Sequence, residues 1–304
     1  MISSLLFHLF LLLFLAPLLP GVIARVKAMI AGRRGQPLLQ LYWDIGKLFR
    51  KGMVLSATTT WVFRTGPLIG VVSPLLAAML VPFGAQHAPI SFTGDLILFV
   101  YLLALARFFT VLSALDTGSS FEGMGAAREV TFAVLVEPTI FVAFIVLARI
   151  AGNFTLDAMF NAGTAGQLLS SEAAITLPFI ALCLFIVLLV ENCRIPFDDP
   201  NTHLELTMIH EVMVLDHSGP DFGLILYGAS MKLLLFSALV LNLLLPATGN
   251  GLLDMICFAA GLLVIAVAVG LVESSMARLR LIRVPQLLVG TTLLSFFALI
   301  LLLR

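Results

Sequence analysis

Long apolar runs separated by shorter polar segments are the main feature of this chain. A helix needs roughly 20 mostly apolar residues to cross the hydrocarbon core of a bilayer. About eight runs are expected to do so, and an even number returns the C-terminus to the side on which the chain starts. Their approximate ranges are 2–23, 65–85, 94–114, 130–152, 173–191, 222–246, 252–273 and 284–303. The pattern predicts an all-α polytopic membrane protein, with residues 1–304 in a single integral membrane domain.

The composition excludes a soluble domain. Hydrophobic residues make up 61% of the 304 residues and charged residues only 11%, whereas soluble domains carry about 25% charged residues. Because 17 basic residues balance 17 acidic ones, no overall charge attracts the chain to nucleic acid. Cys183, Cys193 and Cys257 show no paired spacing, so neither a disulfide framework nor a zinc or iron–sulfur site is expected.

Basic residues indicate on which side of the membrane each polar segment lies. The run 2–23 contains no Lys or Arg and is followed by Arg25 and Lys27, whereas a cleaved signal peptide carries its positive charges before the apolar run. We therefore expect a retained span with the N-terminus outside. Lys and Arg accumulate in cytoplasmic segments, which places both termini outside. The segments expected in the cytoplasm are 24–60, 115–129, 192–221 and 274–283.

The segment 24–60 is expected to contain an amphipathic helix. Apolar residues recur at helical spacing from Leu38 to Phe49, and basic residues follow at the end of the pattern, where cations suit the helix dipole. Such a helix lies along the membrane interface. The last basic residues are explained by topology alone, whereas Arg33 and Arg34 lie in a tight turn suited to docking a partner.

The segment 191–221, ENCRIPFDDPNTHLELTMIHEVMVLDHSGPD, concentrates charge between two apolar runs. It contains seven carboxylates, one arginine and three histidines. It is either a water-facing loop or a polar site packed into protein at the membrane surface. Carboxylates that are close together and partly buried cannot all ionise cheaply, so their pKa values spread and respond to a nearby charge. With intramembrane carboxylates leading away from it, the packed site is the favoured interpretation.

The three histidines of this segment recur at seven-residue intervals. His203, His210 and His217 would share a helix face if the segment were helical throughout. Gly219 and Pro220 interrupt that pattern, so a pH-sensitive or docking role is favoured over a metal site.

Ionisable residues also lie within the apolar runs. Glu137 follows Glu129 by eight residues on roughly the same helical face, and Pro138 frees a backbone carbonyl beside it. A carboxylate within a span is costly unless it faces a partner or water, which favours function over a Glu that merely holds helices together. Further ionisable residues in or at the ends of spans are Arg107, Glu191, Lys232 and Glu273. Together they are suited to a proton half-channel rising from the cytoplasmic surface.

Four separated motifs resemble one known family. The segment ENCRIPFD at 191–198, with Pro200, resembles the signature of the membrane-anchor subunit of respiratory complex I and its relatives in membrane-bound hydrogenases. The segment RRGQPLLQ at 33–40 is similar to the first cytoplasmic loop of that family. The segments LDTGS at 115–119 and SMARLRL at 275–281 are most similar to the formate hydrogenlyase and hydrogenase-4 branch.

The resemblance implies a role in a larger complex. A subunit of this family anchors a peripheral arm with a [NiFe] hydrogenase large subunit and iron–sulfur proteins on the cytoplasmic side, and works with antiporter-like membrane subunits in the cytoplasmic (inner) membrane of a prokaryote. It is not itself catalytic and binds no cofactor or metal, since the [NiFe] centre and iron–sulfur clusters belong to its partners. It contacts membrane lipid and no nucleic acid. Electron transfer in the arm is linked to translocation of protons or sodium.

The resemblance also assigns roles to residues. Glu191, Asp198, Glu205 and Asp216 correspond to loop carboxylates that respond to redox events, and Arg194 to their charge partner. The full set expected to form the proton path or its coupling is Glu129, Glu137, Glu191, Arg194, Asp198, Glu205, Glu211, Asp216, Lys232 and Glu273. The residues expected to dock partners are Arg33, Arg34, Asp44, Arg128, Arg278 and Arg280.

Two other functions stay open at this point. A quinone-site subunit of a complex I-type oxidoreductase would need an amphipathic tunnel that opens to lipid. A stand-alone secondary transporter often shows inverted repeats with matched broken spans, and the two halves of this chain show no such repeat.

Overall fold

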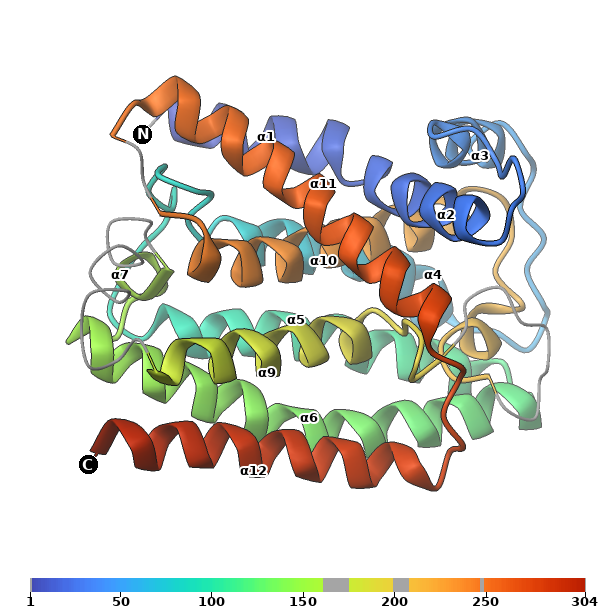
Figure 1. The fold of residues 1–304 in the computed structure, drawn as a ribbon. Coiled ribbons are helices and arrows are strands. Elements are labelled where there is room, and N and C mark those ends of the chain that lie inside the picture. Colours follow the sequence, from blue (N-terminus) through green and yellow to red (C-terminus); the bar gives the residue numbers. More distant parts are fainter. Residues whose placement is uncertain (1, 161–174, 199–207, 247–248, 304) are drawn as a thin grey trace.

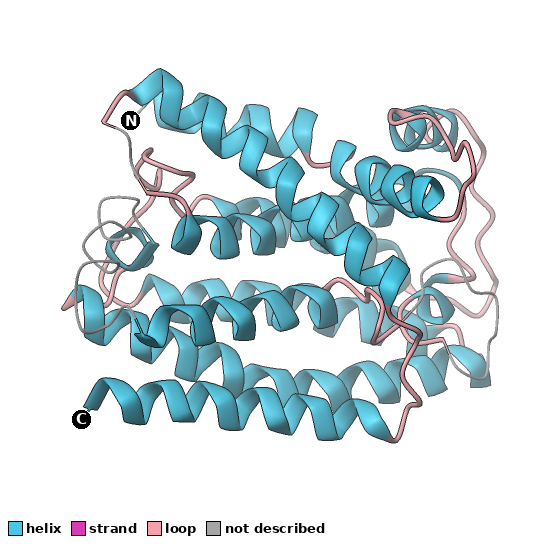
Figure 2. Cartoon of the chain, in the orientation of Figure 1, coloured by secondary structure: helices cyan, strands magenta, loops and turns pink. Residues whose placement is uncertain are grey.

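The computed structural model describes the whole chain except residues 1, 161–174, 199–207, 247–248 and 304. Within the described residues the fold is built from helices without any β-strand, as Figure 2 shows, which confirms the all-α prediction. The elements are α1 (Ile2–Phe10), η1 (Leu11–Leu15), α2 (Leu18–Ile30), α3 (Gln40–Leu48), α4 (Trp61–Ala78), α5 (Asp95–Asp116), α6 (Ser120–Ala151), α7 (Leu156–Phe160), α9 (Thr176–Glu191), η3 (Glu211–Val214), α10 (Gly219–Leu244), α11 (Gly251–Ser275) and α12 (Arg283–Leu303).

The helices form a bundle with a common long direction (Figure 1). Helices α2 and α11 lie on one side and α6 and α12 on the other, with α4, α5, α9 and α10 between them (Figure 1). Helix α3 and the described parts of 192–221 lie at one end of the bundle, while α1 begins and α12 ends at the opposite end. The polar segments expected to share one membrane face therefore gather at one end of the molecule.

The number of membrane spans is close to the predicted eight. Among the described residues, six helices are long and apolar enough to cross a bilayer, namely α4, α5, α6, α10, α11 and α12. The bent pair formed by residues 4–15 and α2 brings the number to seven if it counts as one span. Helix α9 is apolar but has 16 residues, and the predicted span at 173–191 begins outside the described residues. The protein is therefore a multi-pass membrane protein, and eight is an approximate count.

The first span is broken in its middle. The π-helix η1 and Pro17 lie between α1 and α2, and the two parts are bent by 43°. A π-helical turn and a proline both leave carbonyl oxygens without their usual helical partners. Here the hydroxyl of Tyr42 from α3 donates to the carbonyl of Phe14, and the hydroxyl of Tyr227 from α10 donates to that of Leu13 at 3.3 Å. The break thus ties the interfacial helix and the core of the bundle to the first span.

Helix α10 lies at the centre of the bundle and crosses α4 closely. A Cβ atom placed on Gly228 of α10 would lie 2.4 Å from the carbonyl oxygen of Gly70 in α4. That distance is too short for any side chain, so glycine is required for the two backbones to approach as they do. The close crossing also sets the spacing of the polar side chains that α10 and its neighbours direct inward.

We predict that Gly228→Val separates α4 from α10 and destabilises the protein by roughly 1–3 kcal/mol, the usual cost of overpacking a core. Thermal unfolding of the detergent-solubilised protein checks this. Gly290→Val in α12 is the matched control, because no atom lies within 4 Å of a Cβ built there. Equal unfolding temperatures for the two variants would show that the close approach of α4 and α10 does not require glycine at position 228.

Candidate functional site

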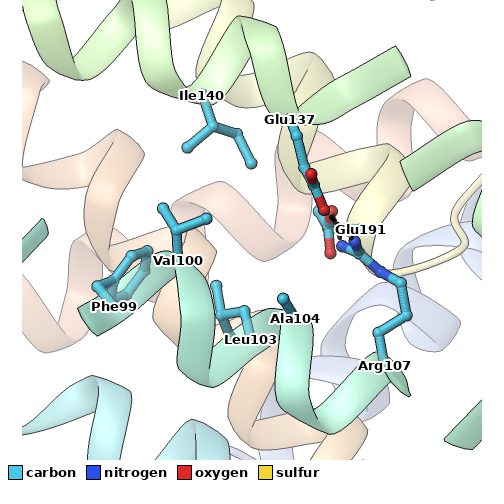
Figure 3. A pocket seen from close by; sticks show the side chains of 8 residues that line it. All are labelled: Phe99, Val100, Leu103, Ala104, Arg107, Glu137, Ile140 and Glu191. Atoms are coloured by element: carbon cyan, nitrogen blue, oxygen red, sulfur yellow. Dashed lines mark hydrogen bonds and ion pairs between the residues drawn. The ribbon is translucent and has the colours of Figure 1, made fainter. Parts of the chain in front are cut away.

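The guanidinium of Arg107 lies at the centre of a buried cluster of carboxylates. It projects from α5, and its Nη1 atom lies 2.9 Å from Oε1 of Glu137 in α6. Its Nη2 atom donates to Oε1 of Glu191, the last residue of α9, and its Nε atom lies 3.7 Å from Oε1 of Glu129. Figure 3 shows Glu137 and Glu191 converging on this one guanidinium. One arginine therefore holds three helices together by charge.

Lysine 232 extends the cluster to a fourth helix. Its ammonium, from α10, lies 2.8 Å from Oε2 of Glu191. The side chain of Glu191 is 3% exposed, so both of its oxygens depend on these cations. An unpaired carboxylate in such a place costs several kcal/mol. We call Arg107, Glu129, Glu137, Glu191 and Lys232 the Arg107 cluster.

A second cluster surrounds Glu273 at the end of α11. The carboxylate is fully buried, with Oε2 2.8 Å from the ammonium of Lys27 in α2 and Oε1 3.4 Å from Nη1 of Arg194. Arg194 lies shortly after the end of α9. Its charge partner in the structure is Glu273, and not a described carboxylate of its own loop. This pairing connects the start of the 192–221 segment to α2 and α11.

Aspartate 198 organises the segment that follows α9. Its Oδ1 atom lies 2.8 Å from Nη2 of Arg278, and its Oδ2 atom accepts hydrogen bonds from the backbone N–H groups of Ile209 (3.0 Å) and His210 (3.3 Å). Nearby, Arg128 of α6 donates to the carbonyl of Met208 at 2.8 Å. Asp198 and Met208 are buried, so the described part of the 191–221 segment is packed against the helices and is not a solvated loop.

Two cavities connect these groups. A cavity of about 20 Å³ is lined by Asp198, Arg107, Glu129 and Glu191 among others. This volume, lined by charged groups, has room for one water molecule. A larger cavity of about 420 Å³ borders both charged clusters and is lined in part by Lys27, Asp44, Arg194, Glu211, His217, Lys232 and Glu273. The structure therefore offers polar space between the packed loop and the intramembrane carboxylates.

The remaining predicted residues lie in different surroundings. Glu211 begins η3 and lines the large cavity, whereas Asp216 is exposed and its backbone N–H donates to Oε1 of Glu122 at 3.3 Å. Glu205 lies outside the described residues, as does His203. The exposed residues predicted to dock partners are Arg33, Arg34 and Arg280, while Asp44 is partly buried and lies 3.7 Å from the ammonium of Lys47.

The two described histidines do not share a helix face. His210 and His217 lie on either side of the short helix η3, and neither is in a helix. Burial lowers the pKa of His210, and it lowers that of His217 to about 4, so both side chains are neutral at pH 7. Among the described residues, no group of three or more His, Cys, Asp or Glu side chains is arranged to hold a metal ion.

The sequence gives little sign that Arg107 and Lys27 are central to the two clusters. It predicts Arg107 as an ionisable residue within a span, but not that three carboxylates meet at its side chain. Lys27 was explained by topology, although it is paired with the buried Glu273. The signal for Arg107 is that an arginine in the middle of an apolar run requires an acidic partner. No comparable signal exists for Lys27, because basic residues are common beside a span.

We predict that Arg107→Met strongly destabilises the protein, because Glu129, Glu137 and Glu191 lose their shared cation. Removing one partner of a buried ion pair costs about 3–5 kcal/mol. The double variant Arg107→Met/Glu191→Gln should recover part of this loss, since the most buried carboxylate is then neutral. Thermal unfolding in detergent measures both. A single variant as stable as the parent protein would contradict the role of Arg107 as the central charge.

We predict that stability falls as the pH is lowered from about 6.5 towards 4. The ring of His217 stacks on Phe63 with centroids 3.9 Å apart, and burial lowers its pKa to about 4 from the ordinary 6.5. Between these pH values the unfolded chain binds a proton that the folded chain does not, so stability rises with pH there. The full effect is on the order of 3 kcal/mol. Unfolding temperatures of the parent protein and His217→Gln at pH 7 and pH 5 test this: equal losses in both would rule out His217 as the cause.

Comparisons with known proteins place nearly the whole chain in one family. Residues 2–303 match a family described as NADH dehydrogenase. The chain is 34% identical over 274 residues to hydrogenase-4 component C of Escherichia coli (strain K12), covering 88% of this chain and 85% of that protein. It is 35% identical over 279 residues to formate hydrogenlyase subunit 4 of the same organism, covering 90% and 89% of the two chains.

More distant similarities extend to one further sequence relative and to one solved structure. The chain is 26% identical over 255 residues to a subunit of the NADH-quinone oxidoreductase of Syntrophotalea carbinolica, covering 81% of this chain and 74% of that protein. A chain in the structure of the membrane-bound sulfane sulfur reductase, an archaeal respiratory membrane complex, superposes with a TM-score of 0.81 at 23% identity and covers 99% of both chains. That likeness shows a shared fold. The resemblance predicted from the loop motifs is confirmed, and the chain belongs to the NADH dehydrogenase family.

Proposed function

We propose that this chain is the membrane-anchor and coupling subunit of a formate hydrogenlyase-like or energy-converting [NiFe] hydrogenase complex. In this role it docks a peripheral redox arm at the end of the bundle that carries α3 and the packed 192–221 segment. It links electron transfer in that arm to translocation of protons or sodium ions. The [NiFe] centre and iron–sulfur clusters belong to the arm. The two relatives that are 34% and 35% identical, a hydrogenase-4 component and a formate hydrogenlyase subunit, support this assignment.

One observation carries the proposal: the buried charges form a continuous set from the docking end into the membrane. Asp198 lines the cavity of about 20 Å³ that Glu129, Arg107 and Glu191 also line. From there Arg107 contacts Glu137, which lies 17 residues into the 32-residue helix α6. Each step joins an ionisable group to its neighbour by an ion pair or by a space with room for a water molecule.

The arrangement is suited to passing on a change of charge. In a medium of low dielectric, neighbouring charges interact by several kcal/mol, so a change in protonation at one group alters the proton affinity of the next. Arg107 touches three carboxylates, and strengthening its contact with one weakens its hold on the others. A charge that arrives near Asp198 when the arm is reduced would therefore change the protonation of Glu137.

The docking end follows from the exposed basic residues. Arg33, Arg34 and Arg280 are exposed, and the excess of Lys and Arg supports a cytoplasmic position for this end in the inner membrane of a prokaryote. Arginine is enriched at protein interfaces because its planar group pairs with carboxylates. Iron–sulfur and large hydrogenase subunits are the partners proposed for this surface, and antiporter-like subunits for the sides of the bundle.

A quinone-site subunit is the second candidate. The cavity of about 420 Å³ has mixed polar and apolar walls, of the size and character of a small-molecule site. The relative from an NADH-quinone oxidoreductase is 26% identical and supports this alternative. Inhibition of the assembled complex by quinone-site inhibitors would favour it over the hydrogenase function.

The proposal predicts that gentle purification of the tagged chain recovers hydrogenase-like and iron–sulfur subunits with it. Identification of the co-purified proteins by mass spectrometry is the measurement. Arg33→Glu/Arg34→Glu should reduce the recovery of these subunits, because the charge of the docking surface is reversed. Lys51→Glu, an exposed basic residue of the same segment, is the control. If the parent chain is recovered alone, the anchor function is wrong.

We further predict that Glu137→Gln leaves assembly intact and impairs ion-coupled activity. Glutamine keeps the shape of the side chain and a carbonyl acceptor for Arg107, but it cannot release a proton. The measurement is proton uptake or release by vesicles that contain the assembled complex, alongside its uncoupled redox activity. Asp157→Asn is the control, because Asp157 pairs with His87 in a separate contact. Normal coupled translocation in Glu137→Gln would remove Glu137 from the path.

A further inference from the structure

Glu137 reaches the surface of the bundle at membrane depth. Helix α6 has 32 residues and is therefore about 48 Å long, while the hydrocarbon core is about 30 Å thick. Glu137 lies about 25 Å from the start of the helix. That position is inside the hydrocarbon core wherever the full thickness is placed along α6. Yet 37% of its side chain is exposed, whereas that of Arg107 is 11% exposed and that of Glu191 3%.

The exposed carboxylate lies in a seam between α5 and α6. A cavity of about 10 Å³ in this seam is lined by Glu137 and Ile140 of α6 and by Ala104 and other residues of α5, as Figure 3 shows. Large side chains of both helices are exposed close to these residues in sequence: Tyr101 of α5 is 67% exposed and Val134 of α6 62%. Tyr101 and Ala104 are three residues apart and share a face of α5, as do Val134 and Glu137 on α6.

Lipid alone cannot cover this seam cheaply. One oxygen of Glu137 contacts Arg107, and the residues that the structure describes place no hydrogen-bond donor on its other oxygen. The Arg107 cluster contains three carboxylates and two cations, a formal charge of −1. The excess negative charge is therefore accessible at the one carboxylate that reaches the surface. Charged side chains in the hydrocarbon region face protein or water rather than acyl chains.

We infer that the α5–α6 seam is a docking site for a transmembrane helix of another membrane subunit. That helix places a hydrogen-bond-donating side chain, a protonatable or hydroxyl group, against the free oxygen of Glu137. Apolar residues on either side of the donor pack against Tyr101 and Val134. Interhelical hydrogen bonds of this kind stabilise helix pairs in membranes only modestly, so packing against Tyr101 and Val134 supplies the remainder. The inference rests on the proposed function only in requiring a second membrane subunit.

A photo-crosslinking amino acid at position 101 of the chain in its intact complex tests the inference. We expect an adduct with a multi-pass subunit, and its crosslinked peptide should map within about one helical turn of a donor side chain. The adduct should disappear when Glu137→Leu is combined with the probe and persist with Glu137→Asp, because aspartate keeps two carboxylate oxygens, one for Arg107 and one for the partner, and leucine has none. In both variants Arg107 retains Glu129 and Glu191, so the peripheral subunits should still co-purify.

Two results would overturn the docking site. Labelling of lipid alone, or of a second copy of this chain, would show that no partner helix occupies the seam. An adduct that is equally strong with Glu137→Leu would show that the carboxylate does not position the partner. Co-purification of peripheral subunits separates this failure from that of the proposed function: if they are recovered but position 101 captures no membrane subunit, only the docking site is wrong.

Discussion

The guanidinium of Arg107 is the charge on which the polar interior of this membrane protein depends. It contacts carboxylates from α6 and α9, and through Glu191 it is connected to Lys232 of α10. In a bilayer these groups cannot be solvated by the surrounding medium, so each one requires the others. The close crossing of α4 and α10 at Gly228 helps to place Lys232 within reach. The close packing of the helices and the pairing of the buried charges therefore depend on each other.

The same constraint connects the membrane interior to the polar end of the molecule. Asp198 fixes the backbone near His210 and pairs with Arg278, and Glu273 pairs with both Lys27 and Arg194. The start of the segment after α9 is thus held by two ion pairs, one at Arg194 and one at Asp198. A rearrangement at the proposed docking surface would have to alter at least one of these pairs. This is the physical basis for treating the segment as a coupling element rather than as a loop.

Much of this could be predicted from the sequence, and the limits have physical causes. Apolar runs define membrane helices because the bilayer sets their length, and the segment ENCRIPFD at 191–198 identified the family. The break in the first span was not predicted from the apolar run 2–23, although Pro17, a residue that bends helices, marks its position. Which charged side chains form ion pairs depends on how the helices are rotated and which of them pack together, and the sequence does not show this. Arg194 therefore pairs with Glu273, 79 residues away, instead of with a carboxylate of its own loop.

The central claim is that the buried carboxylates change protonation when the redox arm changes its oxidation state. Infrared difference spectra of the assembled complex, recorded between its oxidised and reduced forms, test this most directly. The account predicts a change in the carboxyl C=O stretching region that is lost or shifted in Glu137→Gln, with the other bands retained. A spectrum without carboxyl bands, or with bands that Glu137→Gln leaves unchanged, would contradict the account.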